Sequence, residues 1–328
     1  MRRSGRLHAT RAGVAALALS VAGCTSPGSR AKQMPEGGGV AASGGPESTP
    51  AQVAAAQATE STGGGLTSPP SAATAAAQQA ARPSGPPVTV TAALEESLVT
   101  PLREHYDARV TEYTSPGLNR TIDIIITELA RYPDQMLKDC VTTVLVVGSI
   151  EDANGTKGGG TYLASVRCLY IVGLYPDEGW TEQAVAGAVH HELSSLVFNR
   201  HRDRFPEALW LRQNPIDYRY DFRPDEGGSA AVAAGMGSRE LKVDILQQGF
   251  LSRYAQSSLE DDYNETVKTI MVNPGWISQF KTHYPRVYNK MILAMRFYRD
   301  CYPEFVPPDP LSEQPRPAPE PRVQEPRR

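Results

Sequence analysis

The stretch TEQAVAGAVHHELSSLVFN, residues 181–199, decides the fold, because it is a helix pattern with a polar cluster in its middle. Thr181 is a residue type favoured at helix N-caps, and it predicts a helix that runs to about Asn199. The segment Ala188–Ser195 reads AVHHELSS and places imidazole, carboxylate and hydroxyl groups within two turns. This helix is therefore the first candidate for a functional site.

His191 and Glu192 form half of a metal-binding pattern. A zinc peptidase needs two histidines four residues apart on one helical face, and a glutamate beside the first histidine to take a proton from metal-bound water. The second histidine is expected at position 195, where the chain has Ser195, a poor zinc ligand. His190 cannot take its place, because it lies about 100° around the helix from His191. The His-Glu pair alone also fits polar residues on the surface face of an amphipathic helix.

The serines of HHELSS allow two further hypotheses. Ser195 could hold a metal-bound water, or His190, His201 or His283 could reach the site from elsewhere in the fold. A serine nucleophile at Ser194 or Ser195, activated by a histidine, is disfavoured because neither serine stands in a glycine-flanked elbow.

The segments around this helix predict an α+β domain with a small sheet first and mainly helices afterwards. β-Branched and apolar runs predict strands at 109–113, 142–150 and 161–173, with a glycine loop at 158–160 between the last two. Helical spacing predicts helices at 92–106 and 118–131, and later at 259–271 and 287–298. Residues 214–240 have no regular pattern.

The two ends of the chain differ in composition from its middle. The chain has 328 residues, and its first aromatic residue is Tyr106. Residues 24–89 are mostly Ala, Gly, Ser, Pro, Thr and Gln, and residues 306–328 are rich in Pro, Glu and Arg. Such segments bury too little apolar surface to offset their ordering entropy. We therefore expect a disordered tether at 24–89, one domain at 90–305, and a disordered tail at 306–328.

Residues 1–23 have the pattern of an export signal. Four arginines precede an apolar run, and the run ends in LALSVAGC with Cys24 as its last residue. A basic segment, a short apolar segment and small residues before a cleavage site are typical of secretory signal peptides. The last four residues resemble a bacterial lipobox, in which Cys24 takes the lipid; the alternative is an ordinary signal with a chance cysteine. The prediction is a lipid-anchored protein of the bacterial cell envelope. The sequence leaves open whether the inner or the outer membrane holds the anchor.

The net charge and the cysteines bear on the partners and the disulfides that the protein can have. The formal net charge is −3, which argues against a nucleic-acid partner because phosphate binding needs a basic face. We expect a monomer attached to the membrane by its lipid. In an exported protein a disulfide between Cys140 and Cys168 is one option, and a bridge that includes Cys301 is another.

A second pair of segments gives the chain a family resemblance. GFLSRYA at residues 249–255 is followed by SLEDDYNE at residues 258–265. Together with HHELSS, these segments resemble the zinc-binding metallopeptidase family of bacterial surface lipoproteins, which is related to the anthrax lethal factor catalytic domain. The resemblance covers roughly residues 95–300. It implies a zincin-like fold and a zinc-dependent hydrolysis of peptide bonds.

The resemblance also implies a role for each matching residue. His191 is the first metal ligand, and Glu192 is the general base. Asp261 stands at the position of the third ligand. Glu265 is either an outer carboxylate or a substitute ligand, and Tyr254 donates to the oxyanion of the tetrahedral intermediate.

Two departures from the family pattern leave three functional hypotheses. Ser195 removes a nitrogen ligand, and Asp261 is one methylene shorter than the glutamate of the family. The first hypothesis is a metal-dependent peptidase. The second is an inactive pseudopeptidase that binds peptide or glycan at the cell surface, and the third is a structural envelope protein.

Overall fold

A four-stranded sheet forms one side of the domain. The computed structural model describes residues 87–223 and 227–308. The sheet has the strand order β1-β3-β7-β6, with β3 parallel to β1 and β7 and with β6 antiparallel to β7. Its strands are β1 (Thr89–Thr91), β3 (Thr143–Val147), β6 (Gly160–Leu163) and β7 (Cys168–Val172). A smaller antiparallel sheet has the order β2-β4-β5, and its strands are β2 (Arg109–Thr111), β4 (Ser149–Glu151) and β5 (Lys157–Gly158).

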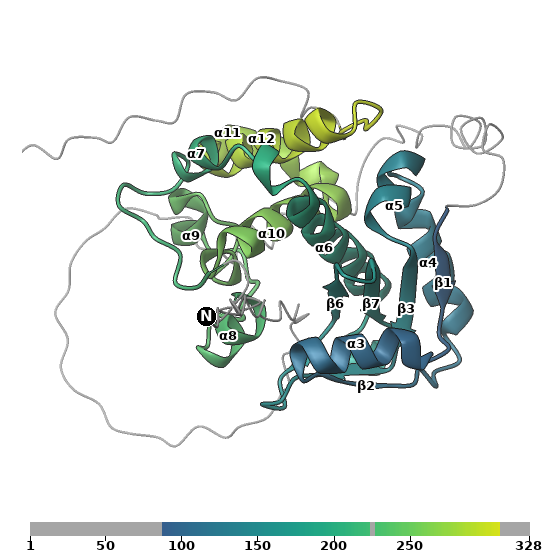
Figure 1. Ribbon diagram of the computed structural model, residues 1–328. Coiled ribbons are helices and arrows are strands. Elements are labelled where there is room, and N and C mark those ends of the chain that lie inside the picture. Colours follow the sequence, from purple (N-terminus) through teal and green to yellow (C-terminus); the bar gives the residue numbers. More distant parts are fainter. Residues whose placement is uncertain (1–86, 224–226, 309–328) are drawn as a thin grey trace, which may run out of the picture.

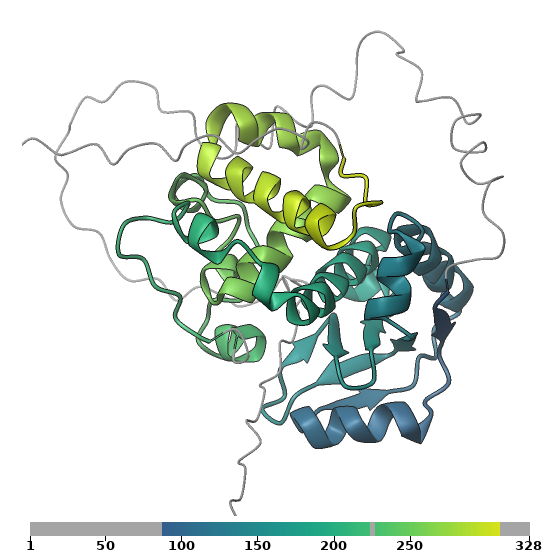
Figure 2. The same cartoon turned by 45° about the horizontal axis from the view of Figure 1, so that its top comes forward.

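Alternation along β3 and β7 gives the larger sheet two apolar faces. Val144 and Val146 belong to the larger core, which contains residues of α4 (Leu118–Leu129), α5 (Asp134–Cys140) and α6 (Glu182–Arg200). Leu145 and Val147 belong to a second core with residues of α3 (Glu96–Tyr106). The sheet is therefore covered on both faces (Figure 2).

The expected strand 142–150 is two strands in different sheets. They separate at Gly148, where a Cβ atom would lie 2.4 Å from the backbone oxygen of Glu112. Only glycine permits this close approach, so the chain bends there and β4 joins the smaller sheet. The expected glycine loop at 158–160 is also wrong, because Gly158 ends β5 and Gly160 begins β6.

The longest described helix, α6, lies between the sheet and the C-terminal helices (Figure 1). Its N-cap is Thr181, as predicted, and the Thr181 hydroxyl accepts a hydrogen bond of 3.3 Å from the Ala184 amide. Every residue from Val185 to Phe198 is buried. The C-terminal helices are α7 (Glu207–Leu211), α8 (Gly227–Ala233), α9 (Val243–Gln248), α10 (Leu259–Val272), α11 (Ile277–His283) and α12 (Pro285–Cys301). The α+β prediction is confirmed.

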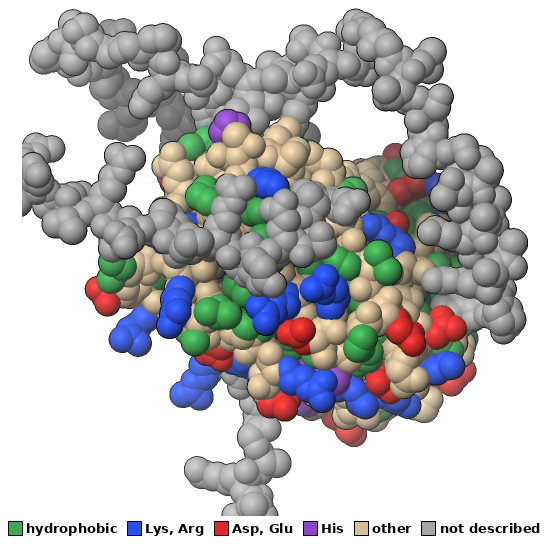
Figure 3. Space-filling model, turned by 90° about the horizontal axis from the view of Figure 1, so that it is seen from above, with side chains coloured by type: hydrophobic (Ala, Val, Ile, Leu, Met, Phe, Trp, Pro, Cys, Tyr) green, Lys and Arg blue, Asp and Glu red, His purple; other side chains and the backbone are tan. Residues whose placement is uncertain are grey.

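The tether boundary needs a small correction. Thr89, which composition assigned to the tether, begins β1 and pairs with Thr143. The signal segment, Cys24 and nearly all of the predicted tether and tail lie outside the described residues. None of the described helices is both long and apolar enough to cross a membrane. Lys and Arg side chains are interspersed with Asp and Glu on the face that Figure 3 shows.

Neither the possible disulfide between Cys140 and Cys168 nor a bridge between either of them and Cys301 forms. Both residues are free thiols, as is Cys301. Cys140 lies in the larger core and contacts the Tyr302 hydroxyl at 3.2 Å. Cys168 lies in the second core, on the other face of the sheet, and its thiol donates to the Leu169 carbonyl at 3.4 Å. Both cysteines are close in sequence to strands of the same sheet, but their sulfur atoms lie on opposite faces of it.

Candidate functional site

The two helices that carry the sequence motifs pack directly against each other. α6 supplies His191, Glu192 and Ser195, and α10 supplies Asp261 and Glu265. All five residues are buried. The resemblance predicted that these segments meet, and they do. Because buried polar groups must be paired, their contacts decide what the site can do.

Ser194 and Ser195 bind one amide group across the helix interface. Ser194 Oγ donates to Asn264 Oδ1 at 2.7 Å, and Asn264 Nδ2 donates to Ser195 Oγ at 2.7 Å. Ser195 is also hydrogen-bonded to Glu260. The position of the missing second histidine therefore holds a hydroxyl that is already paired on both sides.

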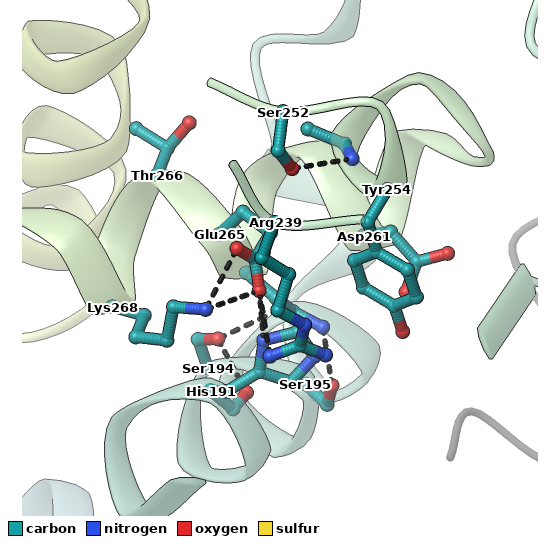
Figure 4. A network of polar contacts seen from close by, with 12 residues as sticks. His191, Ser194, Ser195, Arg239, Ser252, Tyr254, Asp261, Glu265, Thr266 and Lys268 are labelled. Atoms are coloured by element: carbon teal, nitrogen blue, oxygen red, sulfur yellow. Dashed lines mark hydrogen bonds and ion pairs between the residues drawn. The ribbon is translucent and has the colours of Figure 1, made fainter. Parts of the chain in front are cut away.

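Glu265 is the centre of an ion cluster (Figure 4). Its Oε1 lies 3.2 Å from His191 Nδ1 and 3.2 Å from an Arg239 guanidinium nitrogen. Lys268 Nζ contacts both carboxylate oxygens, at 2.6 and 2.7 Å. Only 4% of the Glu265 side chain is exposed. One buried carboxylate is thus held by two cations and an imidazole.

The pKa values of the groups in this cluster show which of them are charged at neutral pH. Burial raises the pKa of Glu265, but Arg239 and Lys268 lower it more, so it is well below the usual range. Burial lowers the pKa of His191 to about 4 against the opposing effect of Glu265. Burial and the Arg239 charge lower the pKa of Lys268 to about 8. At neutral pH the carboxylate and both cations are charged, and the imidazole is neutral.

The pKa of Arg239 is shifted by the carboxylates to which the sequence assigned catalytic or metal-binding roles. Burial lowers the pKa of Arg239, but the charges of Glu265, Asp261 and Glu192, together with Tyr254, raise it by more than burial lowers it. The net shift is upward. The guanidinium carbon lies 4.5 Å from the centre of the Tyr254 ring, within the range of a cation–π contact. Of the three carboxylates that the sequence assigned to metal chemistry, Glu265 contacts Arg239, and Asp261 and Glu192 act on its charge.

Asp261 is hydrogen-bonded to the N-cap of the helix on which it lies. Its Oδ2 accepts hydrogen bonds from Ser257 at 2.6 Å and Ser258 at 2.8 Å, and its amide donates to Ser258 Oγ at 3.0 Å. Ser258 is the N-cap of α10, so Ser258-x-x-Asp261 is a variant of the capping box. Tyr254 is fully buried and is hydrogen-bonded to Asp261. Burial, then Asp261, raises the pKa of Tyr254 well above its usual value.

These residues do not fit a zinc ion. A catalytic zinc site uses three protein ligands. Among residues 87–223 and 227–308, no group of three His, Cys, Asp or Glu side chains could hold a metal. Within those ranges, His191 Nε2 and Asp261 Oδ1 are buried without a hydrogen-bond partner. Glu265 could have been a third ligand, but its carboxylate is already paired with Arg239 and Lys268.

His190 and His201 do not complete the set. His190 points to a different neighbour from His191: its Nδ1 contacts the Tyr132 hydroxyl at 2.6 Å, and its Nε2 contacts Glu128 at 2.7 Å. His201 contacts the Tyr302 hydroxyl at 2.9 Å. The hypothesis that a histidine from elsewhere replaces the missing ligand therefore finds no support for these two residues.

Sequence reasoning missed three members of the site: Arg239, Lys268 and Asn264. Lys268 follows Glu265 by three residues on one helix, and this spacing is a signal that could have found the pair. Asn264 lies one residue before Glu265 and faces the serines of α6. Arg239 lies in the irregular part of the chain, residues 214–240, where no periodicity predicts the direction of a side chain.

Glu260 is a further buried acid beside this cluster. It accepts a hydrogen bond of 2.9 Å from the Tyr162 hydroxyl. Burial raises the pKa of Glu260 to about 7, and the Asp261 charge adds to the rise. Because the unfolded chain loses this proton near pH 4.5, the folded state is penalised as the pH rises from about 4.5 to 7.

We expect Glu260→Gln to remove this penalty. Natural protein should lose up to about 3 kcal/mol of unfolding free energy between pH 5 and pH 8 from this group, whereas the variant should not. The measurement is urea denaturation at both pH values, with the exposed Glu104→Gln as the control. Equal pH dependence in the natural protein and Glu260→Gln would show that Glu260 does not titrate in this range.

Comparisons with known proteins give little further guidance. No protein-family model matches the sequence, and no curated protein is significantly similar to it. One similar solved structure is that of a "putative zinc-binding metallo-peptidase" from Bacteroides caccae. It shares 15% sequence identity, with a TM-score of 0.40, over 66% of this chain and 81% of that chain. A similarity this distant carries no argument about the fold or the activity of this chain.

Proposed function

We propose that the folded domain is a binding module that works without a metal ion. The observation that carries this proposal is the pairing of Glu265 with Arg239 and Lys268. A divalent ion would supply positive charge to the carboxylates of α6 and α10, and here two side chains supply it. This is the pseudopeptidase hypothesis, in which the helices of a metallopeptidase-like site are kept for binding.

Metal-dependent hydrolysis is less well supported by the same geometry. In that mechanism His191 and Asp261 would help to hold the metal, and Glu192 would be the general base. Ser195 is already hydrogen-bonded to Asn264, and Asp261 is hydrogen-bonded to the serines that cap α10. Ser195 is therefore not free to replace the missing nitrogen ligand, and the hydrogen bonds to Asp261 engage its Oδ2.

The proposal for the whole chain adds the N-terminal signal. Cleavage before Cys24 and lipidation of that residue would attach the chain to the outer surface of a bacterial membrane. The tether would then hold the domain away from the lipid. In this setting the ligand is a peptide or a glycan of the cell surface, and the protein acts as a monomer.

The test is peptide cleavage by the purified full chain. We would incubate it with a mixture of unstructured peptides, with and without a chelator, and detect products by mass spectrometry. The variants are Glu192→Gln and, as a matched control at an exposed site, Glu104→Gln. We expect no cleavage that depends on Glu192. Cleavage that is lost both with chelator and in Glu192→Gln, but not in Glu104→Gln, would replace this proposal with the metallopeptidase.

A further inference from the structure

A cavity of about 370 Å³ lies at the N-terminal end of α6. One side of it is formed by Trp180 and the first turn of α6, including Gln183 and Ala184. Lys268 and Asn273, at the C-terminal end of α10 and just beyond it, also line it, as does Arg239. The volume is in the range of small-ligand pockets, roughly 300–1,000 Å³. The two cations that hold Glu265 therefore also face a space that a ligand could enter.

The shape of α6 at this point leaves room for Lys268. A Cβ atom on Gly187 would lie 3.3 Å from Cδ of Lys268, so the lysine side chain crosses α6 where that helix has no side chain. Gly187 and Lys268 both line the cavity. The cation is thus positioned by the packing of the two helices.

The charges around the cavity favour an anion with a single charge. Arg239 and Lys268 line it, whereas Glu265 and Glu192 do not. Glu265 offsets part of the positive charge, and Glu192 acts on both cations at longer range. The N-terminus of α6 adds about half a positive charge. The sum suits a carboxylate better than a doubly charged phosphate.

The remaining lining groups suit a peptide. Gln183 Nε2 donates to Asn273 Oδ1 at 3.1 Å, and both side chains line the cavity. Side-chain amides can pair with the N–H and C=O groups of a peptide backbone. Trp180 adds an aromatic surface for an apolar side chain.

We propose that this cavity binds the free C-terminal carboxylate of a peptide, with Lys268 and Arg239 as its charge partners. The inference deepens the proposed function and rests on it. It assigns the ligand class, and it places binding at the N-terminal end of α6 instead of at His191 and Glu192.

The test compares two probes that differ only in their C-terminal group, which is charged in one and neutral in the other. N-acetyl-Ala-Ala with a free carboxylate and the same dipeptide as its C-terminal amide are titrated into the full chain and followed by ligand-observed NMR. A charge-assisted hydrogen bond contributes about 1.5–3 kcal/mol, which corresponds to at least tenfold in affinity. We expect the acid to bind at least about tenfold more tightly than the amide. Equal binding of the two probes, or no saturable binding of the acid, would overturn the inference.

Variants locate the site. Lys268→Gln should weaken binding of the acid by about tenfold, and Lys138→Gln, at an exposed position on α5, should leave it unchanged. Equal loss in both variants, or in neither, would contradict the assignment. If Lys268→Gln does not fold, the comparison of acid and amide on the natural protein still decides.

Two further conditions separate the possible failures. Inorganic phosphate is titrated as a third probe, and tighter binding of phosphate than of the acid would overturn the choice of a carboxylate. Every titration is repeated with chelator. If chelator abolishes binding, the metal-free function itself is wrong; if binding survives chelator but ignores the carboxylate, only the present inference is wrong.

Discussion

Replacing Glu265 with glutamine should lower the free energy of unfolding by about 3–5 kcal/mol. The substitution keeps the shape of the side chain but removes its charge, and it leaves Arg239 and Lys268 close together with their main anionic partner removed. Two buried cations in that position repel each other and lose the hydrogen bonds that offset their desolvation. The measurement is urea denaturation of the natural chain and the variant at pH 7.

The matched controls for Glu265→Gln are a surface acid and a second substitution within the cluster. Glu240 is exposed and paired with Lys242, so Glu240→Gln should change stability by less than about 0.5 kcal/mol. Adding Lys268→Gln to Glu265→Gln should recover part of the loss, because it removes one of the unpaired cations. A loss below about 1 kcal/mol for Glu265→Gln would mean that the carboxylate does not hold the two cations.

Lys290→Met should destabilise the C-terminal helices by a similar amount, about 3–5 kcal/mol. Lys290 Nζ on α12 lies 2.6 Å from Asp262 Oδ2 on α10, and each side chain is only 1% exposed. Trp210 and Tyr220 also donate to this carboxylate oxygen, at 2.8 and 2.7 Å. They are neutral donors, so removing the lysine leaves a buried charge without its counterion. Thermal and urea unfolding both measure the loss.

Lys242→Met is the control for this pair, because Lys242 also contacts an acid but is 51% exposed. It should alter stability by no more than about 1 kcal/mol. The double variant Asp262→Leu/Lys290→Met should be more stable than Lys290→Met alone, since it removes the stranded charge. If it is not, the loss comes from packing of the lysine stem instead of from its charge.

Much of the secondary structure followed from local patterns. The N-cap at Thr181 and the apolar spacing of 118–131 and 287–298 predicted helices that form near those limits. The continuous apolar run of 142–150 hid a change of sheet, because the close approach at Gly148 depends on a backbone segment more than thirty residues away. Cys140 and Cys168 were misjudged for a similar reason, since sequence did not say which face of the sheet each thiol takes.

For the candidate site, the sequence indicated which two segments meet, but not how their buried charges are paired. The resemblance predicted that HHELSS and SLEDDYNE meet, and α6 and α10 do pack together. It assigned Asp261 to a metal, whereas a Ser-x-x-Asp pattern at the start of a helix also predicts a cap. Arg239 could not be foreseen, because its segment has no regular hydrophobic spacing and its partners, Glu265 and Tyr254, lie elsewhere in the chain. The pairing of buried charges depends on the tertiary structure, so the residues next to each charge in the sequence do not predict it.

Metal content tests the absence of a bound ion most directly. The purified full chain would be incubated with excess zinc, dialysed, and analysed by elemental mass spectrometry beside a His191→Ala variant. With Arg239 and Lys268 supplying the positive charge around Glu265, we expect no stoichiometric zinc in either protein. One zinc per natural chain, lost in His191→Ala, would contradict a metal-free site and restore the metallopeptidase.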